Sequence, residues 1–502
     1  MTNPFSEESE MFARECDAAT ISKDIERLKN LVDQALKGIE NHDAASQANI
    51  YYSIGTIHAD IAFLTGNMND ELSRKKQLYY FRKSIEIIER EEFSNSEYRP
   101  YVLALKFNLY TNYANALEHL GRKIEAIEQY KKVLAINPNF GMASGNLGVA
   151  YQHYGMLVSD PWHRDLLHNC AYTLLSKAIA SEDKYIYEKA RERFRLLRGN
   201  YDFEYVEKVL SVDPAFSQFE YDDADELEYR KWALRNGLFL NPLNDLPYSE
   251  IAFAADVLQL PSMTVKIDAK PIFHGMFNQL KQEYVFARYQ YYLGIQATDK
   301  PHFADKDTYL LQFPDYPLYS IRIEQLKSSF RILFSLLDKA AFFINAYYDL
   351  GIKERDVSFS AIWKSEKPKN YKYKNVLDPT ANFALASLYW ISKDFYEAFV
   401  DSPNPQAKRV SDIRHALEHR YSKVYWDIFP ERANGEIDDL AIYISEEELI
   451  EETFRLLKLI REVIICLALA VGIEERKRNA SASPNTVVPQ ISFLNYDDEW
   501  KL

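Results

Sequence analysis

The chain has 502 residues, which is long for one hydrophobic core and predicts about two or three domains. Its formal net charge of −14 excludes non-specific electrostatic binding of nucleic acid by the protein as a whole, so any RNA contact has to come from a local basic surface. Aromatic residues make up 14% of the chain, and there are only 15 Gly and 19 Pro, which excludes a disordered chain and favours a helix-rich globular protein.

The cysteines and the chain termini predict a cytoplasmic protein. Cys16, Cys170 and Cys466 are scattered, without paired or metal-type spacing, as expected in a reducing compartment. Residues 1–8 are polar and acidic and do not resemble a signal peptide. The longest apolar run, 463–471, is too short to span a bilayer, so we expect a buried helix there and no membrane association.

The first third of the chain contains an internal repeat. Residues 110–139 place small, turn, small, aromatic and terminating residues at the spacing of a tetratricopeptide (TPR) repeat. These residues are Ala114, Gly121, Ala126, Tyr130 and Pro138. A second copy begins at Asn146, and a degenerate copy at Ile54. Residues 1–215 are therefore predicted to form a TPR-like array that holds a protein or peptide ligand, with a ligand-free helical spacer as the alternative.

Residues 216–270 differ in composition from the array. The stretch 220–228 holds six acidic residues and no basic one, so we expect it to repel itself and form a solvated hinge. The following stretch, 229–246, is apolar and contains Asn-Gly and Asn-Pro turns. We expect it to dock against the next domain.

Helical periodicity returns in residues 271–478. Apolar residues recur every three or four positions from Ile323 to Tyr348, which predicts a helix of about eight turns. Further helices are predicted over 381–399 and 406–429. A final helix is predicted to begin after Ser445, which forms a capping box with Glu448 three positions later. The sequence thus predicts an all-α protein in which an up-and-down helical bundle follows the array, with a polar tail over 479–502.

A group of basic side chains within 406–429 points to chemistry. Arg414 supplies a fixed cation, and His419 and His415 titrate near neutral pH, which is the minimum equipment for cleaving RNA without a metal. On an ideal helix Arg414 and His419 diverge by roughly 140°, so a cleft built from two such helices is expected. The alternative is a solvated basic face without activity.

The segment IRHALEHRY, 413–421, resembles the motif of the HEPN ribonuclease superfamily, in which an Arg and a polar residue precede a His. Arg414 and His419 match the two main positions, and His415 occupies the polar place where Asn is commonest. The segments RKWALRNGLFLNPLNDL and FNQLKQEYVFARYQYY resemble the bacterial branch in which a HEPN bundle follows TPR-like repeats. The resemblance covers roughly 229–478 and implies RNase activity in a cleft between two protomers of a homodimer.

The same residues also spell the inverted zinc-peptidase motif. His415, Glu418 and His419 form H-x-x-E-H, in which two histidines one helical turn apart bind zinc. A third ligand is available from the acidic residues of 446–452. The flanking Arg414 and Arg420 oppose a cation site, so we predict no metal and no other cofactor.

A lysine-rich stretch, 363–374, is the best candidate for further RNA contact. It interleaves basic and aromatic side chains, a composition suited to phosphates and stacked bases, although a soluble loop between helices explains it equally well. The predicted RNA-binding residues are Lys367, Lys369, Lys372, Lys374, Arg420, Tyr371 and Tyr373.

Together these features predict a metal-independent endoribonuclease of the toxin or antiviral-defence kind, regulated by its TPR-like array. The competing hypothesis is a non-catalytic scaffold that binds RNA or protein.

Overall fold

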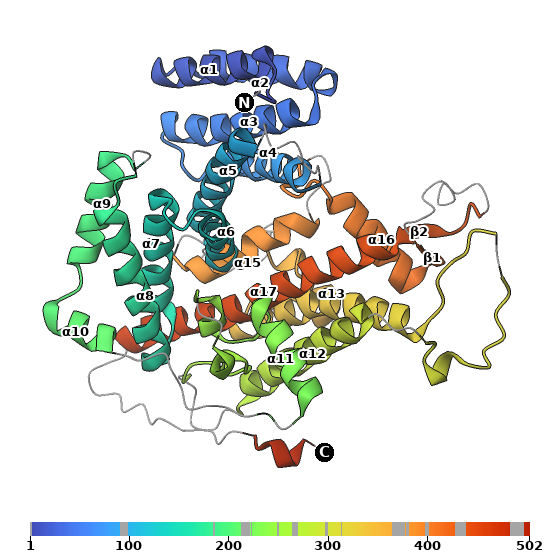
Figure 1. Ribbon diagram of the computed structural model, residues 1–502. Helices are drawn as coiled ribbons and strands as arrows, with labels where there is room; N and C mark the ends of the chain where they lie inside the picture. The colour runs from blue at the N-terminus through green and yellow to red at the C-terminus, as the bar shows by residue number, and fades with distance from the viewer. Residues whose placement is uncertain are drawn as a thin grey trace.

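The computed structural model describes most of the chain as α-helix. The described residues are 3–90, 99–183, 186–211, 221, 223–247, 250–263, 270–296, 300–312, 314–363, 377, 381–396, 401–426, 438–481 and 496–501. The all-α prediction is confirmed, with one small sheet added (Figure 1).

Antiparallel helix pairs build the N-terminal part, as the repeat pattern predicts (Figure 1). The helices are α1 Glu7–Ile21, α2 Ile25–Gly38, α3 Ala44–Leu64, α4 Glu71–Arg90, α5 Arg99–His119, α6 Lys123–Ile136, α7 Gly141–Leu157, α8 Pro161–Ala180, α9 Glu188–Gly199 and α10 Phe203–Ser211. Several begin at side-chain caps; for example, the Asp160 carboxylate accepts from the His163 N–H ahead of Pro161.

The predicted repeat 110–139 is the pair α5 and α6, and Gly121 makes its turn. This residue has φ +83°, and a Cβ there would lie 2.4 Å from the Phe383 carbonyl oxygen of the C-terminal bundle. Gly121 therefore serves two purposes: it reverses the chain between the two helices and lets the bundle approach the array backbone.

The connecting segment is more ordered than its acidic composition predicted. Its described acidic residues are exposed, as predicted, but they form the cap and the start of helix α11, Ala224–Arg235, and not a hinge. The Asp223 carboxylate caps this helix, and Asp225 and Glu226 lie in its first turn, where the helix dipole favours negative charge. The predicted docking is observed: the buried side chains of 238–246 join one core with the array and the bundle.

The C-terminal part is a bundle of long helices around a central one (Figure 1). The helices are α12 Ile272–Ile295, α13 Ile321–Tyr347, α15 Phe383–Tyr396, α16 Ala407–His419 and α17 Glu446–Ala480. The Ser445 hydroxyl caps α17 by accepting from the Glu448 N–H at 3.0 Å, as predicted. The run 463–471 is buried, and no described helix is long and apolar enough to cross a membrane.

One predicted helix is wrong in length. The stretch 406–429 was expected to be a single helix, but α16 ends at His419 and the chain continues into β1, Ser422–Tyr425. This strand pairs in parallel with β2, Ile442–Ser445, with Lys423 opposite Tyr443. The pairing gives the backbone N–H and C=O groups of these residues the hydrogen-bond partners that a longer helix would otherwise have supplied.

Buried ion pairs join the array to the bundle. Arg82 of α4 and Arg122, next to α6, each donate to the Asp394 carboxylate of α15 at 2.6 Å. Although burial alone would raise it, the two guanidinium groups hold the pKa of Asp394 below its usual value. In the connecting segment, Asp245 accepts from Arg461 of α17 at 2.7 Å. Charge pairs thus fix the array on one side of α15 and α17.

Removing the shared carboxylate should destabilise the protein. Asp394→Ala leaves Arg82 and Arg122 buried without their partner, so we expect the free energy of unfolding to fall by about 3–5 kcal/mol. Urea denaturation measures this change. As the control, Glu26→Ala removes an exposed pair with Lys29 and should cost less than about 0.5 kcal/mol. Equal stability of the two variants would contradict the role assigned to Asp394.

Candidate active site

The basic motif lies in the last two turns of α16, not near the start of a helix as the predicted 406–429 helix implied. Arg420 is the C-cap, with extended backbone angles of φ −133° and ψ 174°. Only Tyr421 separates this cap from β1, and the Leu318 N–H, from the segment before α13, donates to the Val424 carbonyl at 2.7 Å. This arrangement presents the end of α16 at one end of the bundle, beside the sheet (Figure 1).

Arg414 is half-buried and held in place by two neighbours. Its guanidinium carbon lies 4.5 Å from the ring centroid of Phe334 on α13. Its Nε lies 3.3 Å from a carboxylate oxygen of Glu418, one turn further along α16. A cation stacked on a ring and paired with a carboxylate keeps a defined orientation, which a freely rotating surface arginine does not.

The two histidines are exposed neighbours on α16. The His419 side chain is 68% exposed, and its Nε2 lies 3.5 Å from the same Glu418 oxygen. The ring centroids of His415 and His419 are 6.0 Å apart, with the planes inclined at 72°. Two imidazoles therefore face solvent side by side, beside a positioned arginine.

Glu418 is the residue that sequence reasoning overlooked as a member of this site. It lies between the divergent directions of Arg414 and His419 on the helix and contacts both side chains. The available signal was its position, four residues after Arg414 and next to His419. In the sequence analysis Glu418 had appeared only as part of the zinc motif.

A buried lysine supports the surface next to the motif. The Nζ of Lys423 lies 2.5 Å from Asp315 and 3.0 Å from Asp438, and the Tyr443 hydroxyl also donates to Asp315. Burial would lower the pKa of Lys423, but its hydrogen bonds to the two carboxylates raise it overall. Lys423 is consequently a structural cation that orients β1, and it is not available to RNA.

Other predicted site residues are only partly placed. The candidates Lys367, Lys369, Lys372, Lys374, Tyr371 and Tyr373 lie outside the described residues, while Arg420 is exposed beside His419.

Two possible third ligands of the zinc hypothesis are engaged elsewhere. Glu446 pairs with Arg322, and Glu448 with Arg409. No group of three or more His, Cys, Asp or Glu that would hold a metal occurs within the described ranges.

Comparison with protein-family models assigns both parts of the chain. Residues 264–474 match the LA2681-like HEPN family, and residues 107–140 match the tetratricopeptide repeat. The chain carries an LA2681-like HEPN domain preceded by a tetratricopeptide repeat. No curated protein and no solved structure matches it.

The HEPN match covers the five bundle helices almost completely and includes the whole of α16. The match to this family fits a nuclease-type or RNA-binding role, and the repeat fits an array that contacts other molecules. The predicted resemblance to a HEPN domain that follows TPR-like repeats is confirmed.

Proposed function

We propose that this HEPN protein is a metal-independent endoribonuclease whose catalytic residues are Arg414, His415 and His419. The observation that supports the proposal best is the shared contact of Arg414 and His419 with Glu418, beside the exposed ring of His415. This arrangement offers two proton-transfer groups and one fixed cation at a solvent-accessible surface.

Each group matches one requirement of RNA cleavage. One imidazole takes the proton of the 2′-OH, whose oxygen then attacks the phosphorus. The second imidazole protonates the departing 5′-oxygen, which leaves a 2′,3′-cyclic phosphate and a 5′-OH end. Because the attacking and leaving oxygens lie on opposite sides of the phosphorus, two separate histidines suit this task. Arg414 stabilises the negative charge that builds on the phosphate oxygens.

The surface around the motif offers further contacts for a single-stranded RNA. Arg420 and Tyr421 directly follow His419 and are exposed, and Trp426 is exposed after β1, so a cation and two aromatic rings are available for phosphates and unpaired bases. The lysines and tyrosines of 367–374 remain proposed RNA contacts.

A twofold dimer through the HEPN domain completes the proposal. The stretch 300–312, which we call the arm, projects beside β1 and β2 at the end of the bundle that carries the motif (Figure 1). Tyr309 is 96% exposed, and Phe303 and Leu311 are also largely exposed. Large apolar side chains gathered on one projecting segment are typical of a protein interface. A partner bound there would bring a second copy of the motif nearby.

The biological role follows from the two parts together. We infer that the array acts as a sensor or regulator of a toxin or antiviral effector that acts in the cytoplasm. A non-catalytic RNA-binding scaffold is the other outcome of the next experiment.

The motif is tested by the activity of single variants. His419→Ala and Arg414→Ala should each lower the rate of RNA cleavage by about 10²–10⁴-fold, since each removes a group that acts on the transition state. Cleavage by the unaltered protein should survive chelator and leave a 2′,3′-cyclic phosphate, as read by end-labelling and mass spectrometry. His42→Ala, on the array, is the control and should cleave normally. Binding without cleavage by the pure unaltered protein would favour the scaffold.

Glu418 should act as a positioning residue. Glu418→Ala frees both Arg414 and His419, so we expect kcat to fall about tenfold to a hundredfold with little change in KM. Asp412→Ala makes the same charge change on the exposed side of α16 and serves as the matched control. A change in KM alone would assign Glu418 to substrate binding instead.

The arm should control dimerisation. Tyr309→Asp combined with Leu311→Asp should convert the dimer to a monomer in sedimentation and reduce cleavage, because the charges disrupt an apolar interface. Folding should be affected by less than about 0.5 kcal/mol, since both side chains are exposed. Ile21→Asp, an equally exposed apolar position on α1, should stay dimeric. An unaltered protein that is monomeric and still cuts RNA would refute the shared cleft.

A further inference from the structure

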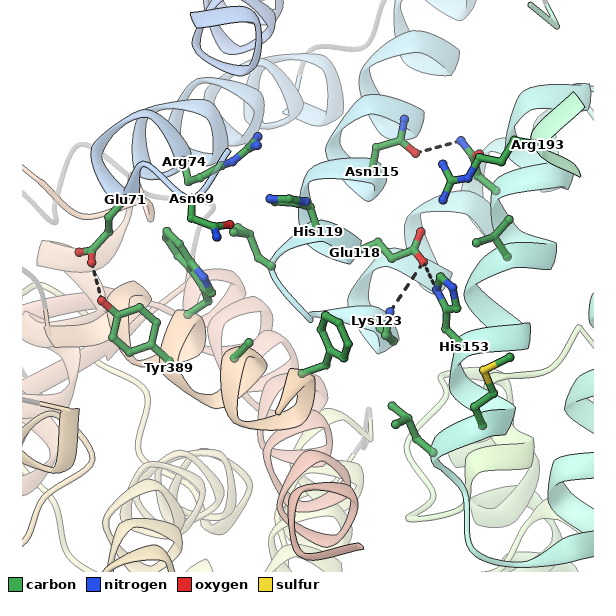
Figure 2. A pocket seen from close by; sticks show the side chains of 18 of the residues that line it. Asn69, Glu71, Arg74, Asn115, Glu118, His119, Lys123, His153, Arg193 and Tyr389 are labelled. Atoms are coloured by element: carbon green, nitrogen blue, oxygen red, sulfur yellow. Dashed lines mark hydrogen bonds and ion pairs between the residues drawn. The ribbon is translucent and has the colours of Figure 1, made fainter. Parts of the chain in front are cut away.

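A cavity of about 1170 Å³ lies between the array and the HEPN bundle. The array contributes the inner helices α5, α7 and α9 together with parts of α4 and α6, and the bundle contributes α15 (Figure 2). The cavity is larger than the roughly 300–1,000 Å³ of most small-molecule pockets. It is remote from the residues of the catalytic motif, none of which lines it.

One wall of the cavity is cationic. Lys189 and Arg193 lie one turn apart on α9, are exposed, and form no ion pair within the described part of the chain. Figure 2 shows Arg193 beside the helices that carry Asn115 and His153. The acid Glu118 is already matched, since His153 lies 3.0 Å and Lys123 3.7 Å from the same carboxylate oxygen. In a chain with net charge −14, this local excess of positive charge favours an anionic ligand.

The Asn115 amide adds a further donor beside this wall. The Asn115 side-chain oxygen already accepts from the Tyr130 hydroxyl at 2.6 Å and from the Asn146 amide at 2.9 Å. No hydrogen bond within the described residues uses the Nδ2 of Asn115. Together with Lys189 and Arg193, that amide offers only N–H groups, which suits a ligand with only acceptors. A phosphate has this property, whereas a peptide backbone presents both donors and acceptors.

The opposite wall is aromatic and belongs to the bundle. Phe383, the first residue of α15, is 55% exposed although it lines the cavity. Tyr389 and Trp390 follow on the same helix, and the Trp363 ring centroid is 5.8 Å from that of Tyr389. The Tyr389 hydroxyl donates to Glu71 of the array. Flat apolar faces opposite a phosphate-binding wall suit a nucleobase.

We propose that this cavity binds a nucleotide, with its phosphates on Lys189 and Arg193 and its base against the aromatic residues of α15. The same chemistry occurs in free nucleotides and at the 5′ ends of RNA, and we assign the site to free nucleotides because the cavity lies between two domains. A bound nucleotide contacts both parts of the chain and so stabilises the docked arrangement.

If the proposed nuclease function holds, the nucleotide also regulates it. Phe395, at the far end of α15, packs on Phe334 with ring centroids 5.4 Å apart, and Phe334 lies under Arg414. Occupation of the cavity thus acts on α15, whose Phe395 packs against the ring under the catalytic arginine. This consequence rests on the proposed function, whereas binding of the nucleotide does not.

The test measures binding of ATP to the full chain by isothermal titration calorimetry, without RNA. ATP should bind at least about tenfold more tightly than adenosine, which lacks the phosphates, or inorganic triphosphate, which lacks the base. Lys189→Glu combined with Arg193→Glu should weaken ATP binding by at least about tenfold. Arg195→Glu is the control, since it lies on α9 but outside the cavity, and it should bind ATP normally.

A second variant separates the aromatic wall from the cationic one. Phe383→Ala should weaken ATP binding and leave that of inorganic triphosphate unchanged. Absence of ATP binding to the unaltered, folded protein would overturn the proposal. So would binding confined to a 5′-triphosphorylated RNA oligonucleotide or to an acidic peptide. If the unaltered protein binds ATP but does not cleave RNA in a separate assay, the proposed nuclease function is refuted and the nucleotide site is not.

Discussion

The contact between the array and the bundle depends on one buried carboxylate, which forms ion pairs with two arginine side chains. Asp394 is paired with Arg82 of α4 and with Arg122, the residue before α6. A buried charge without its partner costs several kcal/mol, so the array and α15 are stable in this position only when all three groups meet. The pair of Arg461 with Asp245 applies the same constraint to the connecting segment. These charges specify one arrangement where apolar packing alone would tolerate several.

A further buried acid lies at this contact. Glu462 of α17 is buried near Arg122, and burial raises its pKa to about 8 even though Arg122 opposes the shift. Its side chain contacts the Ser387 hydroxyl at 3.1 Å. The two arginines are balanced by Asp394 and by Glu125, which pairs with Arg122. Because burial disfavours the charged form of Glu462, the buried part of α17 runs through this contact with less unpaired negative charge.

The parts of the fold that the sequence predicts are those that local interactions determine. The turn at Gly121, the apolar stripe of α13 and the Ser445 cap each depend on residues a few positions apart, and the structure contains all three. The end of α16 does not depend on local interactions. It requires β1 to pair with β2, and Lys423 to meet Asp315 more than a hundred residues earlier. Such long-range pairings leave no periodic signal in the segment itself.

The same distinction applies to the candidate site. Arg414 and His419 are visible in the sequence as residue types, but their common contact with Glu418 depends on side-chain direction. Likewise, the aromatic residues of 383–396 read simply as a buried helix, because only the folded array shows that Phe383 faces a cavity.

Helix α15 connects the three features that matter most for function. Its first residue, Phe383, lines the cavity; Asp394 holds the two arginines of the array; and Phe395 packs behind the ring that supports Arg414. These residues span a single helix of 14 residues. A rigid helix transmits a displacement along its whole length, so a change in how the array holds α15 reaches the surroundings of the motif. In the proposed regulation by the array, Phe334 of α13 is the single side chain that connects α15 with Arg414.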